Sequence, residues 1–548
     1  MRSDSSSVAI SRRSVLRGAG AGALGAAVLG PAGLGSPSGT PASAAPGAPA
    51  PGATAIVIGS GFGGAVAALR LGEAGITTTV FERGRRWPIR PNGNTFATFD
   101  RPDRRAAWFD DTAGISSVGR VPTQRYPGVL DTIRGNGIES VHGAGVGGGS
   151  LVFGAFTLQP DKADFETVFP GGTGYDELAA EYYPRARKML NTSSLPDDIL
   201  AHPNYVGARS WLRILERYGI APQFVEYAID WDRVRAELAG RAKPGVSIGD
   251  LSYGVNSGAK NSVDHNYLPA AERTGFVTIK PMHEVFEIRE RSRRPGYIVR
   301  ARLIDDARRT VRVVTAEADH LFMAAGSYNT TSLLVRARAQ GTLPRLSPKI
   351  GNGFGGNGDF LIVRTALRDQ HGPIQGGPGY ARIREDRLPG GPATMIYQAS
   401  PFPAPAGSLA TTHLIQVHTD ERGTIDYDHA TGATQLNYPY PEGSSVLDRR
   451  AIAFAQHFHQ RTETRFGHPA NGIPIYDRLS GFGSGATFHG LGGVVVGQAA
   501  DAEGRVRGYD NLYVVDGSFA PGAVGLVNPS LTITALAERT MDRFLSTR

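Results

Sequence analysis

A glycine-rich turn near residue 60 has the spacing of a diphosphate-binding loop. Residues 59–64 are Gly-Ser-Gly-Phe-Gly-Gly and follow the apolar run 55–58, which predicts a buried strand. Gly59 allows a tight turn, Gly61 lets the backbone approach a pyrophosphate, and Gly64 lets the following helix pack closely on the strand. The ligand's negative charge would lie at the helix N-terminus, where free N–H groups favour it.

An acidic residue completes this unit. A helix rich in small residues is expected over 65–75, and residues 77–81 form a second strand that ends at Glu82. A carboxylate at this point accepts hydrogen bonds from both hydroxyls of an adenosine ribose and repels the 2′-phosphate of NADP. The unit predicts an adenine dinucleotide and does not by itself separate FAD from NAD.

Two distant segments also have the character of a cofactor site. Residues 141–156 contain more glycine than a core strand or helix tolerates, which indicates a loop that lets an extended ligand approach the backbone. Residues 511–518 predict a strand ending in Asp-Gly-Ser, followed by the turn 520–529 and a helix over 532–544. Together with the first unit, these segments are expected to surround one cofactor.

The composition indicates a globular chain without cysteine chemistry. The chain has 548 residues, of which 41% are hydrophobic, and it contains no Cys, so disulfides and thiolate metal sites are excluded. Its formal charge of +8 is scattered along the sequence. No nucleic-acid partner is expected, because no recognition motif accompanies the charge. Transient contact with an anionic membrane surface is compatible with it.

The N-terminal segment has the features of an export signal. Residues 12–13 are a twin arginine, residues 18–30 are a weakly apolar run too short and too rich in glycine to span a membrane, and residues 42–44 are Ala-Ser-Ala. We predict a Tat signal peptide over 1–45 and a linker over 46–53, with secretion of the protein already folded around its cofactor. The alternative is a disordered basic tail.

Several motifs occur in the order found in glucose-methanol-choline (GMC) FAD oxidoreductases, and the chain resembles the bacterial cholesterol oxidases of that family, which bind FAD noncovalently. The motifs are the fingerprint 59–64, 145–152 (Gly-Val-Gly-Gly-Gly-Ser-Leu-Val), 322–327 (Phe-Met-Ala-Ala-Gly-Ser), 489–493 (His-Gly-Leu-Gly-Gly) and the tail from Asp516-Gly517-Ser518 to Asn528-Pro529. The likeness covers nearly the whole chain after residue 53.

The resemblance implies an interleaved fold of α/β and α+β character. A Rossmann-like FAD-binding domain would be assembled from 54–90, 253–352 and 504–548. A substrate-binding domain with a large β-sheet would contain 91–252 and 353–503, including the flavin loop 143–154. Beside Gly59, Gly61 and Gly64, the implied cofactor contacts are Phe62, Gly63, Glu82, Gly149, Gly154, Val285 and Gly517.

Alcohol oxidation needs a group that holds the hydroxyl while its carbon donates a hydride to the flavin. The resemblance implies that His489, in a glycine-flanked loop, is the active-site histidine; the alternative is a surface histidine. It also implies that Asn528 orients the substrate oxygen or hydrogen-bonds with reduced flavin. From its place before Pro529 and a helix, Asn528 could instead be a helix N-cap.

Several positions depart from the cholesterol oxidase pattern. Gln398 stands where that family has the glutamate that moves the steroid double bond, and an amide cannot accept this proton. Phe153 and Phe156 replace the asparagine and methionine of the glycine loop, and Phe488 replaces a tyrosine. The tail also has one extra residue before Asn528.

Three functions are compatible with these features. The first is a secreted oxidase of a sterol 3β-hydroxyl that reduces O2 to hydrogen peroxide, without the isomerisation. The second is a GMC alcohol oxidase or dehydrogenase that acts on another bulky alcohol, which the departures favour. The third is a sterol-binding protein stabilised by flavin and impaired in catalysis. No metal site is expected, since His457 and His459 lie two residues apart with no ligand at suitable spacing.

Overall fold

The computed structural model describes residues 52–546 except for several short segments, which are 115–119, 172, 366–371, 400–410, 440–445, 463–464 and 467–484. The described residues belong to one unit, Pro46–Arg548. The predicted signal peptide, 1–45, lies outside them. Within the described ranges, no helix is both long enough and apolar enough to cross a bilayer.

A five-stranded parallel sheet forms the base of the predicted dinucleotide-binding unit. Its order is β23-β13-β1-β2-β9, and every neighbouring pair is parallel. The strands are β1 (Thr54–Ile58), β2 (Thr77–Phe81), β9 (Val277–Lys280), β13 (His320–Met323) and β23 (Leu512–Val514). Segments from the start, the middle and the end of the chain therefore pair in one sheet.

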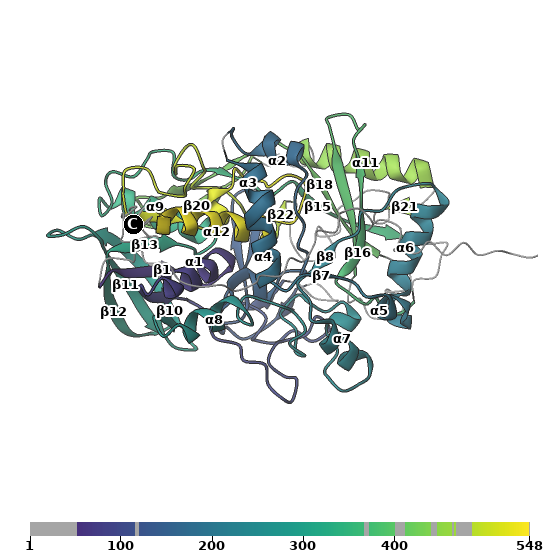
Figure 1. The fold of residues 1–548 in the computed structure, drawn as a ribbon, viewed down its shortest axis with the longest axis horizontal. Helices are drawn as coiled ribbons and strands as arrows, with labels where there is room; N and C mark the ends of the chain where they lie inside the picture. Colours follow the sequence, from purple (N-terminus) through teal and green to yellow (C-terminus); the bar gives the residue numbers. More distant parts are fainter. Residues whose placement is uncertain are drawn as a thin grey trace, which may run out of the picture. The chain divides into compact units, whose positions relative to one another are not determined.

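Helices cover this sheet closely because their contact residues are small. α1 (Phe62–Glu73) buries Gly63, Gly64 and Ala65. It contacts α8 (Tyr267–Arg273) and the C-terminal α12 (Ser530–Ser546), and Figure 1 shows α1 and α12 near β1 and β13. A Cβ on Gly63 would lie 1.7 Å from the carbonyl oxygen of Val515, just after β23. This contact fixes the distance between α1 and the sheet.

A second five-stranded sheet is antiparallel and has the order β16-β17-β18-β15-β21. Its strands are β15 (Asp359–Thr365), β16 (Gly379–Glu385), β17 (Ala393–Gln398), β18 (Thr411–Val417) and β21 (Arg465–Phe466). α6 (Val206–Arg217) and α11 (Val446–Thr462) pack on the face that carries His413, whose ring lies 4.7 Å from that of Trp211. Because side chains alternate along a strand, Thr412 and Leu414 point to the opposite face.

Three smaller sheets complete the framework, in the orders β10-β11-β12, β22-β6-β5 and β14-β19-β20. Their strands are β5 (Leu130–Arg134), β6 (Glu139–Gly143), β10 (His283–Glu290), β11 (Tyr297–Ile304), β12 (Thr310–Ala318), β14 (Asn352–Phe354), β19 (Gly423–Tyr427), β20 (Thr434–Asn437) and β22 (Ala486–Thr487).

The remaining elements are short, apart from α9. They are β3 (Thr112–Ala113), β4 (Val121–Pro122), β7 (Ser193–Ser194), β8 (Glu226–Tyr227), α2 (Lys162–Val168), α3 (Tyr175–Glu177), α4 (Tyr183–Met189), α5 (Asp197–Ala201), α7 (Trp231–Leu238) and α9 (Ser327–Ala339). The predicted fold class is confirmed, with a Rossmann-like parallel sheet and a large antiparallel sheet. The exact domain boundaries stay predictions.

Candidate active site

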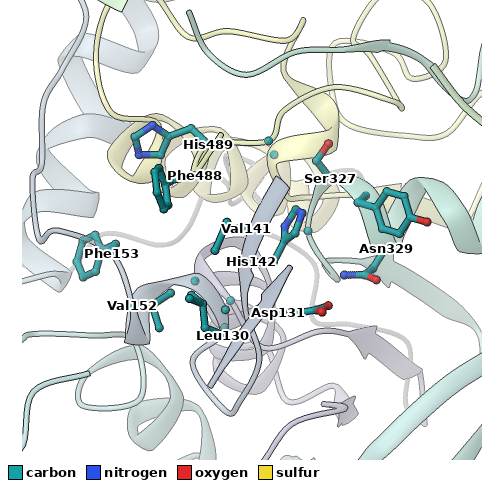
Figure 2. Close-up of a pocket in the computed structure, with 18 of the residues that line it drawn as sticks. Leu130, Asp131, Val141, His142, Val152, Phe153, Ser327, Asn329, Phe488 and His489 are labelled. Carbon is teal, nitrogen blue, oxygen red and sulfur yellow. The ribbon is translucent and has the colours of Figure 1, made fainter. Parts of the chain in front are cut away.

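One large cavity of about 830 Å³ reaches residues of both five-stranded sheets. This volume lies within the range of about 300–1,000 Å³ usual for ligand and cofactor sites. Figure 2 shows His489, Phe488 and Phe153 toward one end of the view and Asp131, Ser327 and Asn329 toward the other. The lining runs from the glycine turn after β1 to His489, as expected for an extended ligand whose reactive part lies near this histidine.

Most of the predicted cofactor residues line this cavity, including the carboxylate at the end of β2. Glu82 accepts hydrogen bonds from the backbone N–H of Ser60 (3.1 Å), the hydroxyl of Ser60 (2.7 Å) and the N–H of Gly84 (2.8 Å). These bonds hold Glu82 beside the glycine turn. The other predicted residues in the lining are Gly59, Gly61, Phe62, Gly63, Gly149, Gly154, Val285 and Gly517.

Gly64 has a packing role instead. It does not line the cavity, and a Cβ there would lie 2.2 Å from the carbonyl oxygen of Gly59. We predicted that Gly64 brings the helix close to the strand, and this contact agrees with that role. We also predicted that it contacts the cofactor, but it is absent from the cavity lining.

The glycine-rich loop lies directly against the fingerprint turn. The Ser60 hydroxyl, which donates to Glu82, accepts from the N–H of Gly147 (3.1 Å), and its oxygen lies 3.3 Å from the carbonyl oxygen of Gly145. Gly145, Gly147 and Gly148 have positive φ, which L side chains rarely adopt. The two segments, distant in sequence, thus form one wall of the cavity.

The residues present fit a bound dinucleotide. The N-terminus of α1 has Gly61 at its cap, no side-chain cap and no acidic residue in its first turn, so its N–H groups suit a diphosphate. A Cβ on Gly149 would meet nothing within 4 Å, which leaves room for a flat ligand against the backbone. The side-chain amide oxygen (Oδ1) of Asn528 is buried with no partner among the described protein atoms, as expected of an atom that faces a ligand.

Asp516 joins the end of β23 to the start of α9. Its carboxylate accepts from the N–H of Gly326 (2.8 Å), the hydroxyl of Thr330 (2.6 Å) and the N–H of Ser518 (2.9 Å). Burial raises the pKa of Asp516 above its usual value. This network holds the backbone of Gly517 at the cavity surface.

His489 follows β22 in a loop that hydrogen bonds hold on both sides of the histidine. Its N–H donates to the Thr487 hydroxyl (3.0 Å), and Leu491 exchanges two backbone hydrogen bonds with Gly355, each 2.9 Å. The imidazole Nδ1 contacts the carboxylate of Asp359. The side chain is 20% exposed and borders the cavity, so His489 is not an exposed surface histidine.

Asn528 lies at His489 rather than at a helix cap. Its amide Nδ2 is 3.4 Å from Nε2 of His489. α12 begins at Ser530, and the carbonyl of Pro529 accepts from the N–H of Ile533 (2.8 Å), which places the helix boundary after Asn528. The alternative of an N-cap role for Asn528 is therefore wrong, because the amide faces the histidine.

One face of the antiparallel sheet forms the wall beside these polar groups. Leu361 pairs with Leu414 and Thr412 pairs with Gln398, and directly paired residues share a face. All four line the cavity, as does Asp359 two residues before Leu361. Gln398 therefore lies on the same wall as the carboxylate that contacts His489.

Aromatic side chains also line the cavity. Phe153, Phe156 and Phe488 all line it, and the rings of Phe62 and Phe153 meet edge to face at 5.2 Å. Phe488 is 40% exposed, an unusual value for a phenylalanine beside a cavity. Two of the substitutions noted in the sequence, Phe153 and Phe156, thus add aromatic rings to the lining, and Phe488 keeps a ring without the tyrosine hydroxyl.

The sequence reasoning missed Asp359, the partner of His489. It lies 130 residues before the histidine and begins β15 after the turn Gly356-Asn357-Gly358. A carboxylate directly before the apolar run 360–363 was the available signal. No motif spacing connects it with His489.

Two basic groups were also missed, Lys260 beneath the glycine-rich loop and His142 in the cavity lining. Lys260 donates to the carbonyls of Leu151 and Leu251 (2.9 Å each) below the glycine-rich loop, and burial lowers the pKa of its amine to about 7. Burial lowers the pKa of His142 to about 4, and its Nε2 has no partner among the described residues. His142 is thus neutral at pH 7, next to the ion pair of Arg83 and Asp131.

Comparison with known proteins relates the chain to a family of flavoenzymes. Residues 420–537 match the model of the GMC oxidoreductase family. The chain is 28% identical to a cholesterol oxidase of Mycobacterium tuberculosis over 550 residues, covering 88% of this chain and 89% of the relative. It is 26% identical to a cholesterol oxidase of Acinetobacter baumannii, with 89% and 93% covered. Paromamine 6′-oxidase of Streptomyces fradiae is also 26% identical, with 88% and 90% covered.

Solved structures show the same fold. A fungal aryl-alcohol oxidase aligns with a TM-score of 0.60 at 15% identity, over 90% of this chain and 98% of the other. Pyridoxine 4-oxidase from Mesorbium loti aligns with a TM-score of 0.58 at 16% identity, over 90% and 99%. In its C-terminal part and in sequence over most of its length, the chain is thus similar to GMC oxidoreductases, and its cofactor is FAD.

Proposed function

We propose that this FAD-dependent alcohol oxidoreductase oxidises the 3β-hydroxyl of a sterol to a ketone. The observation that carries the proposal is the lining around His489, which combines uncharged polar groups, among them Asn528 and Gln398, with large apolar side chains. Phe153, Phe156 and Leu361 are among these apolar side chains, and the carboxylate of Asp359 is occupied by His489. Such a site suits a large apolar alcohol better than a charged amino sugar, whose ammonium groups would need free carboxylates.

The chemistry requires transfer of one proton and one hydride from the alcohol. When bound, FAD supplies the acceptor for the hydride that leaves the carbinol carbon. His489 Nε2 accepts the hydroxyl proton, and the Asn528 amide donates a hydrogen bond to the alcohol oxygen. The apolar walls exclude water and hold the carbinol C–H toward the cofactor.

We further propose that the enzyme uses O2 and releases hydrogen peroxide, and that the steroid product keeps its 5,6 double bond. Gln398 supports the second point, because a neutral amide does not remove the proton that isomerisation requires. The twin arginine at residues 12–13 supports export through the Tat route. Transient contact with a membrane would give the enzyme access to its sterol.

Anaerobic mixing with cholesterol tests the proposal. The yellow, FAD-loaded protein should lose its visible flavin absorbance on addition of cholesterol, and chromatography should recover cholest-5-en-3-one as the product. Admission of air should restore the absorbance and produce one peroxide per sterol oxidised. Bleaching by other bulky alcohols but not by cholesterol would replace the sterol proposal with a different alcohol.

A variant of the histidine provides the control. His489→Gln keeps a polar side chain of similar size that cannot take up a proton, so flavin reduction by the alcohol should slow by about 10²- to 10⁴-fold. Chemical reduction with dithionite should proceed as in the parent protein. If no alcohol bleaches the flavin but cholesterol still binds, the protein is a sterol-binding protein and the proposal is refuted.

A further inference from the structure

We propose that Asp359 is the positioning residue that makes His489 a proton acceptor. The inference rests on the proposed function, in that His489 receives the proton of the alcohol. It concerns a residue that sequence motifs do not mark, and it assigns a specific protonation pattern to the two imidazole nitrogens.

The contacts of Asp359 leave one arrangement of protons on the imidazole. One carboxylate oxygen contacts His489 Nδ1. The other accepts from the amides of Asn357 (3.2 Å) and Gln416 (3.1 Å). A carboxylate with these donors accepts hydrogen bonds and donates none, so the proton of the neutral imidazole lies on Nδ1. The lone pair is therefore on Nε2.

That lone pair points to the place where the alcohol must bind. In this tautomer Nε2 accepts a long hydrogen bond of 3.4 Å from the Asn528 amide at the edge of the cavity, a bond that the hydroxyl of the alcohol would replace. An alcohol oxygen held by this amide can donate its hydrogen to Nε2. As the O–H bond breaks and an N–H bond forms on Nε2, the electron pair of the O–H bond forms the carbonyl, and the carbinol hydrogen departs with the C–H bonding pair; bound FAD would supply the acceptor for this hydride. The resulting imidazolium is stabilised by the negative charge of Asp359.

Asn357 connects the histidine's partner to the loop that carries Asn528. Besides donating to Asp359, its amide nitrogen donates to the carbonyl of Val527 (2.9 Å), and its oxygen accepts from the N–H of Val524 (3.1 Å). Asn357 is 1% exposed and has φ of 62°, a conformation that asparagine tolerates better than most residues. One buried side chain thus sets the relative position of the proton acceptor and the oxygen-binding amide.

Gln398 lies on the same wall of the cavity and cannot act as the proton acceptor. Gln398 and Asp359 lie on the same face of the antiparallel sheet, on β17 and β15 with β18 between them. Since Gln398 cannot take up a proton, His489 is the group on this side of the cavity that can, and Asp359 supports it. A purely structural Asp359 would anchor the loop without affecting where the imidazole proton lies.

Asp359→Asn separates these two roles. The new amide oxygen can still accept from Asn357 and Gln416, which directs the amide nitrogen toward His489 Nδ1. That nitrogen would donate to Nδ1 and force the imidazole proton onto Nε2, where it blocks proton uptake. The maximum rate of flavin reduction should fall by about 10³- to 10⁴-fold, the scale seen when a histidine's aspartate becomes asparagine in a catalytic triad. FAD content and the half-saturating alcohol concentration should change little.

Asp426→Asn is the matched control, since it makes the same exchange in an exposed residue of β19 away from the cavity. It should reduce flavin at the parent rate. A rate for Asp359→Asn close to that of this control would overturn the inference. So would a variant that loses FAD but, once reloaded, reacts at the parent rate.

A measurement without substrate keeps the test independent of the proposed function. In protein labelled with ¹⁵N-histidine, the signals assigned to His489 by their loss in His489→Gln should show hydrogen on Nδ1 in the parent and on Nε2 in Asp359→Asn. Hydrogen on Nε2 in the parent would refute the inference. If cholesterol is not a substrate but the tautomer changes as stated, the sterol proposal fails while the role of Asp359 stands, and the rates are then measured with the alcohol that reduces the flavin.

Discussion

At the scale of single residues, we expect the amide of Gln398, where the cholesterol oxidase pattern has a carboxylate, to limit the reactions that the cavity supports. Gln398 ends β17, and its register partner Thr412 and neighbour Leu414 lie on the same cavity wall. A glutamate here would have the same length and could remove a proton from a steroid carbon. The amide keeps the shape of the wall and removes the base.

Gln398→Glu is expected to restore isomerisation. The variant should convert a 5-en-3-ketosteroid into the conjugated 4-en-3-one, because the side chain regains a proton acceptor at the same place. The increase in absorbance of the conjugated ketone measures this reaction in the absence of alcohol oxidation. Equal isomerisation rates for the parent and the variant would show that residue 398 does not control this step. Gln416→Glu is unsuitable as a control, because Gln416 contacts Asp359.

At the scale of elements, the N-terminus of α1 and the glycine-rich loop form a narrow site between backbone segments. Gly63 brings α1 within van der Waals contact of the segment after β23, whereas Gly149 leaves open space on the cavity side. Both are glycines of the cofactor unit, yet the surroundings give them different roles. One is required for packing, and the other leaves room for the ligand.

The two glycines should respond differently to the addition of a methyl group. Gly63→Ala places Cβ 1.7 Å from a backbone oxygen, and the required shift of α1 should destabilise the fold by about 3 kcal/mol or more. Gly149→Ala should leave the unfolding of the apoprotein within about 0.5 kcal/mol of the parent, because Cβ meets no protein atom within 4 Å. It should weaken FAD binding about tenfold, or about 1.4 kcal/mol.

Denaturant unfolding of the apoproteins and fluorescence titration with FAD measure the two effects. If Gly149→Ala binds FAD as tightly as the parent, the cofactor does not approach the backbone at this position. If Gly63→Ala and the parent have the same midpoint of denaturant unfolding, the fold accommodates the added methyl group next to Val515 without loss of stability.

At the scale of the whole molecule, a buried ionic cluster joins the beginning and the end of the described chain. Glu538 of α12 is fully buried and accepts from Arg70 of α1 through two nitrogens, at 2.7 and 2.8 Å. It also accepts from the Tyr267 hydroxyl of α8 at 2.8 Å. Three helices that cover the parallel sheet therefore meet at one carboxylate, and the C-terminal helix is an integral part of the cofactor domain.

Removal of this charge should destabilise the holoenzyme. Glu538→Gln leaves the partly buried guanidinium of Arg70 without its main counter-ion, which should cost about 3 kcal/mol. Glu73→Gln is the matched control, because Glu73 pairs with the same arginine at 2.7 Å but is about half exposed. This change should cost less than about 1 kcal/mol. Denaturation midpoints measured side by side should therefore differ, and equal midpoints would refute the role of the buried carboxylate.

The sequence by itself determined the strand–turn–helix unit, Glu82 at the end of the second strand, and the order of the family motifs. These features could be predicted because glycine conformation, apolar runs and strand ends are local properties of the chain. The positions of His489 and Asn528 as neighbours followed from resemblance, and their separation of 3.4 Å is a property of the tertiary structure. Local pattern alone allowed Asn528 to be an N-cap, which the facing histidine corrected.

Only the tertiary structure decided that Asp359 would meet His489. A carboxylate at the start of a strand has many possible partners. Asp359 and His489 are 130 residues apart, and no sequence motif relates two residues at that separation. The pairing depends on the register of β15 with β18, because a shift by one residue would turn Asp359 to the opposite face of the sheet. It also depends on the loop contacts of Leu491 and Gly355 that place the histidine above that face. The protonation of the imidazole is thus set by strand register and loop packing, which no local stretch of this chain encodes.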